Sequence, residues 1–358
     1  MSGTSMDGID AVIADFAPTA KGPCALLAAA HVPFTRGLAD ELRSLQRSGA
    51  DELARAARAA NALADAYADA IGAALGQAGL GPAGIVAAGV HGQTLRHRPD
   101  EGWTLQLNNP ARVAERAGVA VVADFRSRDV AAGGEGAPLV PTFHAALFRG
   151  DAHRVVVNVG GIANVTDLPA RGEVRGFDTG PGNVLSDLWH TRHRGTAFDR
   201  DGAWARSGRA DDALLTALLT EPFFARIPPK STGRDLFHGE WLDARLVGRA
   251  LAPADVQATL VALTARTVGD AVAAHCAAAT EILVCGGGAR NAALMDALTA
   301  ALAPRSVATT AAHGVAVEHV EALAFAWLAR EALAGRPGNL PAVTGARGAR
   351  VLGAIYPR

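Results

Sequence analysis

RVVVNVGGIANVTDL, residues 154–168, is the stretch that decides the fold. Its first six residues are rich in valine and predict a strand, Gly160-Gly161 predicts a tight turn, and Ile162–Leu168 predicts a second strand that returns beside the first. Glu173–Phe177 predicts a third strand, and a helix pattern follows it over Val184–Thr191. Strands that pair through short turns and then lead into a helix predict an α/β domain.

The N-terminal half opens in a similar way. A glycine-bearing loop is followed by strand patterns at Asp10–Phe16 and Ala25–Val32. The two openings lie about 150 residues apart, so we predict a duplicated lobe with a cleft between the copies. Residues 1–150 would form the first lobe and residues 151–358 the second, with the last residues packing back on the first lobe. Strand and helix patterns alternate along the rest of the chain, which favours the α/β class.

Composition sets outer limits on function. The chain has 358 residues, of which 49% are hydrophobic and 19% charged, and its formal net charge is -1. This length suggests two domains, and the charge gives no support for nucleic-acid binding. The three cysteines have no metal-type spacing and suit a reducing cytosol. No run reaches the ~20 apolar residues that span a bilayer, and the first residues have no signal-peptide core.

Two glycine-rich stretches carry a carboxylate. In GTSMDGID, residues 3–10, small residues would let backbone amides approach a phosphate, and Asp7 could hold a metal. The alternative is a flexible N-terminus. In GFDTGPGN, residues 176–183, Asp178 ends a predicted strand and sits in a tight turn, on the side of the sheet edge where α/β folds bind ligands. The alternative is an aspartate that only closes the turn; the density of the motif favours a site.

Two further loops suit a nucleotide. CGGGARN, residues 285–291, follows a strand and can accept a flat ring or a phosphate, although tight strand-to-helix packing would explain the same glycines. Its spacing is not that of a dinucleotide fold. PPKSTGRD, residues 228–235, offers two cations and two hydroxyls to a polyphosphate, or is a solvated loop. Lys230 stands out because the chain has only one other lysine, Lys21.

Three features suit a sugar acid. DFRSRD, residues 124–129, precedes GGEGAP, residues 133–138, and its arginines can bind a carboxylate in a bidentate way or form an internal salt-bridge cluster. His91 ends a predicted strand and is either a ligand contact or a satisfied structural histidine. Glu321 lies on an otherwise apolar helix, where a carboxylate is unusual if that face is buried.

Taken together, these stretches resemble the anhydro-N-acetylmuramic acid kinase family. The matching runs occur in one order along essentially the whole chain: SGTSMDGID, HGQT, DFRSRDVAAGGEGAPLVP, VNVGGIANVT, GFDTGPGN, PPKSTGRD, CGGGARN, and EALAFAWLA with PGNLPAVTGA. The resemblance implies the two-lobed, ribonuclease H-like α/β fold of the acetate and sugar kinase/Hsc70/actin superfamily, with a central interdomain cleft. It implies a cytoplasmic kinase of peptidoglycan recycling that uses ATP and Mg²⁺ and has an amino sugar as substrate. It implies no nucleic-acid or membrane partner, and a homodimer is one assembly that the resemblance allows.

The family's chemistry assigns roles by motif. Water opens the substrate's internal 1,6-ether and the released O6 takes the γ-phosphoryl group. Asp178 matches the general base, and Glu321 matches a carboxylate near the sugar and the water. The nucleotide would contact Gly3, Thr4, Ser5, Met6, Asp7, Gly8, Ile9, Asp10, Asn158, Gly160, Gly161, Asn164, Gly180, Gly182, Asn183, Lys230, Gly286, Gly287 and Gly288. The sugar would contact His91, Gln93, Thr94, Arg126, Gly134, Glu135 and Pro138, and Asp7 would hold the metal.

Two departures from the family pattern stand out. Family members usually carry several residues before SGTS, whereas Met1 directly precedes it here, so we expect either a shortened first strand or a start further upstream. Glu135 stands where glutamine is common and adds a negative charge near the sugar. Two other functions remain open: an ordinary sugar kinase that acts on a free hydroxyl, and a non-catalytic protein gated by a nucleotide.

Overall fold

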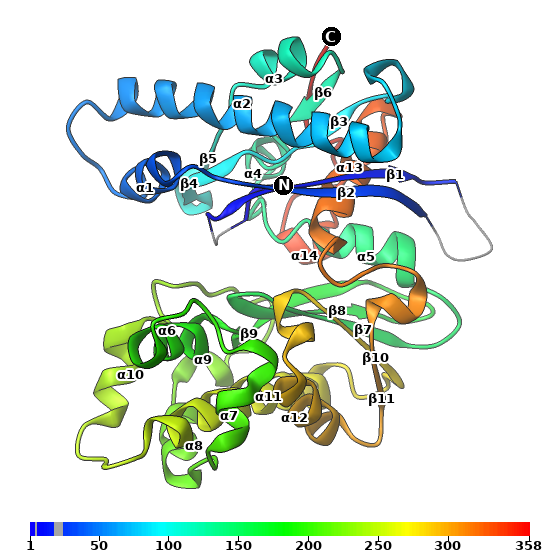
Figure 1. The fold of residues 1–358 in the computed structure, drawn as a ribbon. Coiled ribbons are helices and arrows are strands. Elements are labelled where there is room, and N and C mark those ends of the chain that lie inside the picture. The colour runs from blue at the N-terminus through cyan, green and yellow to red at the C-terminus, as the bar shows by residue number, and fades with distance from the viewer. Residues whose placement is uncertain (4–5, 18–23) are drawn as a thin grey trace. The chain divides into compact units, whose positions relative to one another are not determined.

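The computed structural model describes residues 1–3, 6–17 and 24–358 and divides them into two units (Figure 1). One unit comprises residues 1–143 and 319–358, and the other comprises residues 144–318. The sequence placed the boundary near residue 150 and expected the last residues to return to the first lobe. The first unit gains residues 319–358 because β12 (Ala354–Tyr356) pairs with β6 (Val121–Ala123), and α13 (Val320–Leu333) packs on β1 (Gly8–Asp15) and β3 (Ala88–Val90).

The second unit is built on a five-stranded sheet of order β11-β10-β7-β8-β9. β7 (Arg154–Val159) and β8 (Ile162–Leu168) form the predicted hairpin, and β9 (Arg175–Pro181) pairs with β8. β10 (Glu281–Cys285) and β11 (Ser306–Thr309) run parallel to β7. β9 continues four residues past the predicted end, because its pairing with β8 extends to Pro181. Asp178 therefore lies in the strand and not in the turn that follows it.

Helices cover the second unit on the side of its alternating valines. Val155, Val157 and Val159 point into a core shared with α11 (Pro253–His275) and α12 (Ala292–Leu302). The alternation of strand side chains between two faces explains this selection. The other helical segments of the unit are α6 (Val184–Arg194), η3 (Arg200–Gly202), α7 (Ala203–Ser207), α8 (Asp212–Leu219), α9 (Pro222–Ala225), α10 (Gly239–Leu246), η4 (Gly287–Arg290) and η5 (Thr310–His313).

The first unit holds three small sheets. β1 pairs with β2 (Ala25–Pro33), β3 lies in the order β12-β6-β3, and β4 (Gln93–Arg98) pairs with β5 (Trp103–Leu107). The alanine-rich stretch becomes one helix, α2 (Glu52–Ala78), which buries Leu63 and Tyr67. The remaining helical segments are α1 (Arg36–Ser44), η1 (Pro82–Gly84), η2 (Pro99–Glu101), α3 (Pro110–Ala117), α4 (Ser127–Ala131) and α14 (Pro341–Thr344), and α5 (Val140–Phe148) contains the boundary between the units. None of the described helices is both long and apolar enough to cross a bilayer.

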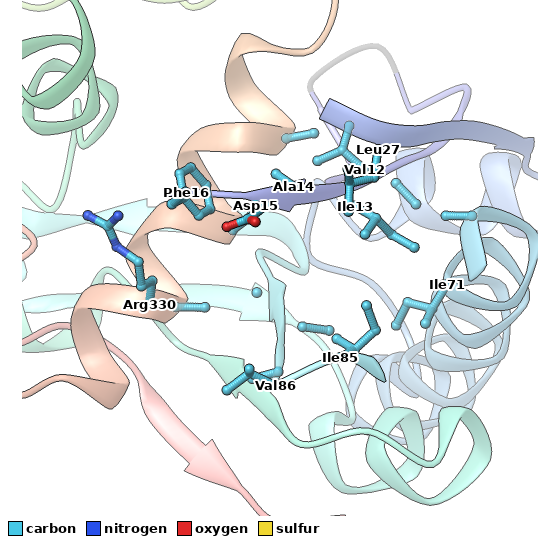
Figure 2. A pocket seen from close by; sticks show the side chains of 18 of the residues that line it. Val12, Ile13, Ala14, Asp15, Phe16, Leu27, Ile71, Ile85, Val86 and Arg330 are labelled. Carbon is cyan, nitrogen blue, oxygen red and sulfur yellow. The ribbon is translucent and has the colours of Figure 1, made fainter. Parts of the chain in front are cut away.

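A groove of about 800 Å³ runs between β1 and β3 in the first unit (Figure 2). Within the described chain β1 pairs only with β2, and β3 only with β6, so each strand has one edge without a partner strand. Helices α2 and α13 supply the other walls, with Ile71 on one side and Arg330 on the other. Met1 lies at the groove and pairs with Asp10 of β1: its amino group donates to the Asp10 carbonyl at 2.7 Å and its carbonyl accepts from the Asp10 amide at 2.9 Å.

We expect a β-forming extension ahead of Met1 to stabilise the first unit. Six alternating valine and threonine residues would continue the pairing that Met1 begins and satisfy strand edges that are otherwise costly to bury. A gain of 1 kcal/mol corresponds to a rise in Tm of about 2–4 °C for a domain of this size, and calorimetry measures it. A glycine-serine extension of equal length is the control. Equal melting temperatures for both extended chains would contradict the expectation.

Candidate functional site

A row of polar side chains crosses the sheet of the second unit. Asn158 of β7 is opposite Asn164 of β8, and Asn164 is opposite Asp178 of β9. On its other side Asn158 is opposite Cys285 of β10. Paired residues share one face of a sheet, and this face is opposite to the valines that pack on α11 and α12. The structure therefore brings together three residues that the sequence predicted separately, on the face of the sheet opposite to Val155, Val157 and Val159.

The Asp178 carboxylate is held by the loop at residues 228–235. Its Oδ2 accepts from the Ser231 hydroxyl at 3.0 Å and from the Thr232 amide at 2.9 Å, and the Asp178 amide donates to the Lys230 carbonyl at 3.0 Å. Burial raises the pKa of Asp178 to about 6, and the two hydrogen bonds and the charge of Lys230 partly offset this rise. A carboxylate with this pKa is mostly ionised at neutral pH and is a stronger base than an exposed aspartate, as a general base requires.

Lys230 is committed to a structural contact. Its ammonium donates to the carbonyls of Phe223 at 3.3 Å and Phe224 at 3.1 Å, at the end of α9, and lies 4.8 Å from the centre of the Phe223 ring. The side chain is buried, and burial lowers its pKa. Cations are favoured where a helix ends because the last carbonyls lack partners. The predicted contact of Lys230 with phosphate remains a prediction, and its ammonium already has two acceptors.

The glycine turn between β7 and β8 is anchored to the end of β9. The Gly160 carbonyl accepts from the Asn183 amide at 2.8 Å, and the Gly161 carbonyl accepts from Gly182 at 2.9 Å and Val184 at 3.0 Å. A side chain at position 182 would lie 2.3 Å from the Gly160 carbonyl oxygen, so only glycine fits there. The amides of Gly160 and Gly161 donate no hydrogen bond within the described part of the chain. These two N–H groups are suited to an anion.

The CGGG turn has a packing role at two of its three glycines. A Cβ at Gly286 would lie 2.5 Å from the Asn158 Oδ1, and one at Gly288 would lie 2.5 Å from a methyl of Val159. Close packing of this turn on the end of β7 therefore requires both glycines. Gly287 differs, because the nearest atom to its Cβ position is the Asn183 Nδ2 at 3.8 Å. The predicted base-binding surface at this turn has room only over Gly287.

The described residues include two charged groups near this site whose roles the sequence did not single out. Asp187 lies one turn into α6, and burial raises its pKa to about 7, with the charge of Arg234 opposing that rise. Arg234 is exposed, and its Nη2 lies 4.0 Å from the Cβ position of Gly161. Arg234 belongs to the PPKSTGRD stretch, but the sequence analysis singled out Lys230 in that stretch because lysine is rare in this chain. Which cation of a loop is available depends on its packing, and the sequence carries no signal for that.

In the first unit the half-buried Arg126 contacts the buried His91. The Arg126 Nε and Nη2 donate to the His91 Nε2 at 3.1 and 3.0 Å, and Nη1 donates to the Gly136 carbonyl at 2.8 Å. Burial, with the charge of Arg126, lowers the pKa of His91 well below its usual value, and burial lowers that of Arg126 to about 10. A neutral His91 that accepts at Nε2 carries its proton on Nδ1. That Nδ1 is buried and makes no hydrogen bond of good geometry with the described residues, although the backbones of Gly92 and Ser2 oppose the fall in the pKa of His91.

Glu321 belongs to the same charged neighbourhood. It stands in the first turn of α13 with its side chain exposed. The surrounding protein nevertheless removes water from the Glu321 carboxyl group, and this desolvation raises its pKa. The positive charge of Arg126 is the largest effect in the opposite direction. Asn108 lies beside Gly92 and was not predicted. Its buried amide nitrogen and oxygen make no hydrogen bond within the described chain. Asn108 is therefore a second side chain near His91 with buried polar atoms that lack a partner among the described residues.

Asp129 organises the loop at residues 133–138. Its side chain is fully buried; Oδ2 accepts from the Gly136 amide at 2.8 Å, and Oδ1 accepts from Asn339 at 2.6 Å and Thr344 at 2.8 Å. No described carboxylate lies within salt-bridge distance of Arg126, so the predicted alternative of an internal salt-bridge cluster is not observed. Asp129 instead holds Gly136, and Gly136 holds Arg126. This chain of contacts fixes the predicted sugar-binding arginine.

Other predicted sugar and phosphate residues have mixed surroundings. Gly134 packs against the Asp129 carboxylate, Glu135 is exposed, and Pro138 follows a cis peptide bond. Gln93 is buried and accepts from the Ser2 hydroxyl at 2.5 Å, and the Thr94 hydroxyl accepts from Gln106 at 3.3 Å.

Thr4 and Ser5 of the predicted phosphate loop lie outside the described residues. Met6 has a φ of 52°, Gly8 packs against the Val32 carbonyl, and Asp10 contacts His31 at 2.8 Å. Ile9 is buried in the core, which gives it a structural role. Asp7 is exposed and directly precedes β1. One exposed carboxylate fits the way proteins usually hold Mg²⁺, which is through one or two carboxylates together with phosphate oxygens.

Comparison with known proteins places the whole chain in one group. The family model for anhydro-N-acetylmuramic acid kinase matches residues 1–358. A protein of that name from Cupriavidus pinatubonensis is 58% identical over 367 residues, covering 100% of this chain and 97% of the relative. One from Burkholderia thailandensis is 55% identical, covering 100% and 96%. A solved activator of 2-hydroxyisocaproyl-CoA dehydratase from Clostridium difficile aligns at a TM-score of 0.41 and 12% identity over 84% of each chain.

Proposed function

The chain belongs to the anhydro-N-acetylmuramic acid kinase family, and we propose that it opens the 1,6-anhydro ring of anhydro-N-acetylmuramic acid with water while phosphorylating O6. It is a phosphotransferase with an alcohol oxygen as acceptor. The products would be N-acetylmuramic acid 6-phosphate and ADP, in the recycling of cell-wall sugars in the cytoplasm. The observation that carries the proposal is the environment of Asp178, whose raised pKa and fixed Oδ2 suit it to take a proton from water.

The proposed reaction couples hydrolysis of the C1–O6 bond to transfer of the γ-phosphoryl group. A water oxygen attacks C1 and gives its proton to Asp178, the C1–O6 bond breaks with its electron pair on O6, and O6 attacks the γ-phosphorus as ADP leaves. A general base contributes ~10²–10⁴-fold to such a step, and the alignment of the reactants contributes more. Asp178 keeps one oxygen engaged by Ser231 and Thr232, so the second oxygen is the one that can face the water.

The nucleotide would be ATP, held by residues that the site already groups. The amides of Gly160 and Gly161 suit a phosphate, and Gly287 is the open position of the CGGG turn. The predicted phosphate contacts of Gly3 and Gly8 remain predictions, and Gly8 is the first residue of β1 and not part of a loop. Mg²⁺ would be held by Asp7 together with phosphate oxygens, and its chemistry is to screen the phosphate charge.

The sugar would be held by Arg126, His91 and Glu321. A guanidinium binds a carboxylate in a bidentate way, which suits the lactyl acid of a muramic sugar. The Nδ1–H of His91, which makes no hydrogen bond of good geometry with the described residues, can donate to a sugar oxygen. Glu321 would accept from a sugar hydroxyl or from the water, because its raised pKa makes it a better acceptor than an ordinary glutamate. Glu135 adds a charge on the same loop as Gly134.

We expect heavy oxygen from labelled water to appear at C1 of the sugar phosphate and not in its phosphate group. ATP, Mg²⁺ and the anhydro-sugar would be incubated in heavy-oxygen water, and the product analysed by mass spectrometry after fragmentation. Because a free C1 hydroxyl exchanges with water, unlabelled product incubated in the same water gives the correction. Label in the phosphate would contradict the proposal.

The same assay separates the two competing functions. An ordinary sugar kinase would phosphorylate sugars with a free O6 hydroxyl and would give no label at C1 beyond that exchange. A nucleotide-gated protein would show no turnover of ATP that depends on any sugar.

A further inference from the structure

The loop at residues 228–235 carries two cations with different surroundings. Lys230 is buried and its ammonium already donates to two carbonyls. Arg234 is exposed, and within the described chain it forms no salt bridge. Arg234 is therefore an exposed cation of this loop that forms no ion pair with a described carboxylate.

The guanidinium of Arg234 lies over the glycine turn. Its Nη2 is 4.0 Å from the point where a Cβ on Gly161 would lie, and the Val184 Cβ is 3.9 Å from the same point. The absence of a side chain at Gly161 leaves that space open. The amides of Gly160 and Gly161 make no hydrogen bond within the described residues. A guanidinium and two unpartnered amides thus border the same space.

These groups are fixed relative to Asp178. The turn is held by three hydrogen bonds from Gly182, Asn183 and Val184. The loop is held by the bonds of Ser231 and Thr232 to the Asp178 carboxylate, three and two residues before Arg234. The cation and the proposed base therefore lie on one short loop, and any shift of that loop moves both.

We propose that Arg234 binds the terminal phosphates of the nucleotide, and that with the amides of Gly160 and Gly161 it forms an anion site beside Asp178. This inference rests on the proposed kinase function and adds a residue to it. A guanidinium offers two parallel donors to phosphate oxygens and keeps its charge at every working pH. It would stabilise the charge that develops on the phosphate oxygens as the phosphoryl group moves to O6.

The charge of Arg234 also acts on the carboxyl group of Asp187. Burial raises the pKa of Asp187 to about 7, and Arg234 is the positive charge that opposes the rise. Near neutral pH Asp187 is therefore only partly ionised and cancels only part of the charge of Arg234. A phosphate with two negative charges would attract Arg234 more strongly than Asp187 does.

Arg234→Gln tests the inference by kinetics. We expect kcat to fall by at least ~10²-fold, because arginines that contact a transferring phosphoryl group have effects of this size or larger. The KM for the anhydro-sugar should change by less than ~3-fold, since the proposed sugar residues lie elsewhere in the chain. Arg234→Ala should recover part of its activity in millimolar guanidinium. Arg226→Gln, which removes an exposed charge eight residues earlier, is the control and should keep the wild-type kcat.

Nucleotide binding provides a readout that does not depend on turnover. Arg234→Gln should weaken ATP and ADP by at least ~10-fold in calorimetric titrations and leave AMP unchanged, because a charge-assisted phosphate contact is worth about one factor of ten or more. The wild-type protein could lack sugar-dependent turnover while Arg234→Gln still weakens ATP and ADP binding and leaves AMP binding unchanged. In that case the proposed function fails and the proposed anion site is supported. Wild-type kcat and ATP affinity in Arg234→Gln, or an equal loss for AMP, would overturn the inference.

Discussion

Asp178→Asn is expected to lower kcat by at least ~10²-fold while ATP and the anhydro-sugar still bind. Asparagine can keep the carbonyl oxygen that accepts from Ser231 and Thr232, so the loop at residues 228–235 should retain its position. It cannot take a proton from water. Steady-state kinetics together with calorimetric titration of both ligands separates loss of chemistry from loss of binding. An asparagine variant with near-normal kcat would remove Asp178 from the role of base.

The pH profile of the wild-type protein tests the same assignment. A base must be ionised to act, so kcat/KM should rise with pH through about 6, the value to which burial raises the pKa of Asp178. Asp187 is the neighbouring carboxylate with a raised pKa, of about 7. In Asp187→Asn the limb near 6 should therefore persist, and in Asp178→Asn the residual activity should lack it. A limb that disappears only in Asp187→Asn would identify Asp187 as the titrating group.

Stability should change in the opposite direction to activity. The folded-state pKa of Asp178, about 6, exceeds the ordinary value of 3.8, so between these pH values the folded protein binds more protons than the unfolded chain. Stability contributed by this group therefore falls as pH rises from about 4 to about 6, and above that range the penalty is up to ~3 kcal/mol. Asparagine carries no such penalty, so Asp178→Asn should melt at a higher temperature than wild type at pH 8. A lower melting temperature would contradict the burial argument.

Asp129→Asn is expected to destabilise the first unit by ~2–4 kcal/mol. The buried carboxylate accepts from Gly136, Asn339 and Thr344, and hydrogen bonds to a charged acceptor are each worth ~1.5–3 kcal/mol. An amide supplies one acceptor oxygen and turns an NH₂ group toward a donor, so at least one bond becomes repulsive. Because Gly136 also accepts from Arg126, the KM for the sugar should rise in the fraction that folds.

The measurement for Asp129 should resolve the two units. Hydrogen exchange followed by mass spectrometry reports each unit separately, whereas a single melting temperature does not when two domains unfold independently. Protection should fall in the peptides of residues 126–140 and 336–350 and stay unchanged over β7 to β9. Asp100→Asn, at an exposed carboxylate, is the matched control and should change stability by less than ~0.5 kcal/mol. Unchanged protection in Asp129→Asn would show that the buried carboxylate contributes little.

The secondary structure near the site could be predicted because it depends on neighbours in the chain. The valine run at 154–159, the glycine turn and the return strand gave the β7-β8 hairpin with its bounds. The end of β9 was wrong by four residues, because pairing with β8 overrides the turn preference of Gly180 and Pro181. Strand length in a sheet is set by the partner strand, which a local pattern does not contain.

The sequence by itself determined the α/β class and the hairpin that carries Asn158 and Asn164, and it led to the prediction that Asp178 is a site residue. Each depends on periodicity or on a dense motif, which are local properties. Only the tertiary structure decided which charges are available and how basic they are. Lys230 and Arg234 are equal cations in the sequence, yet burial against α9 occupies one and leaves the other exposed. Asp129 and Thr344 are 215 residues apart, and burial, which shifts the pKa of Asp178, follows from such distant contacts rather than from neighbouring residues.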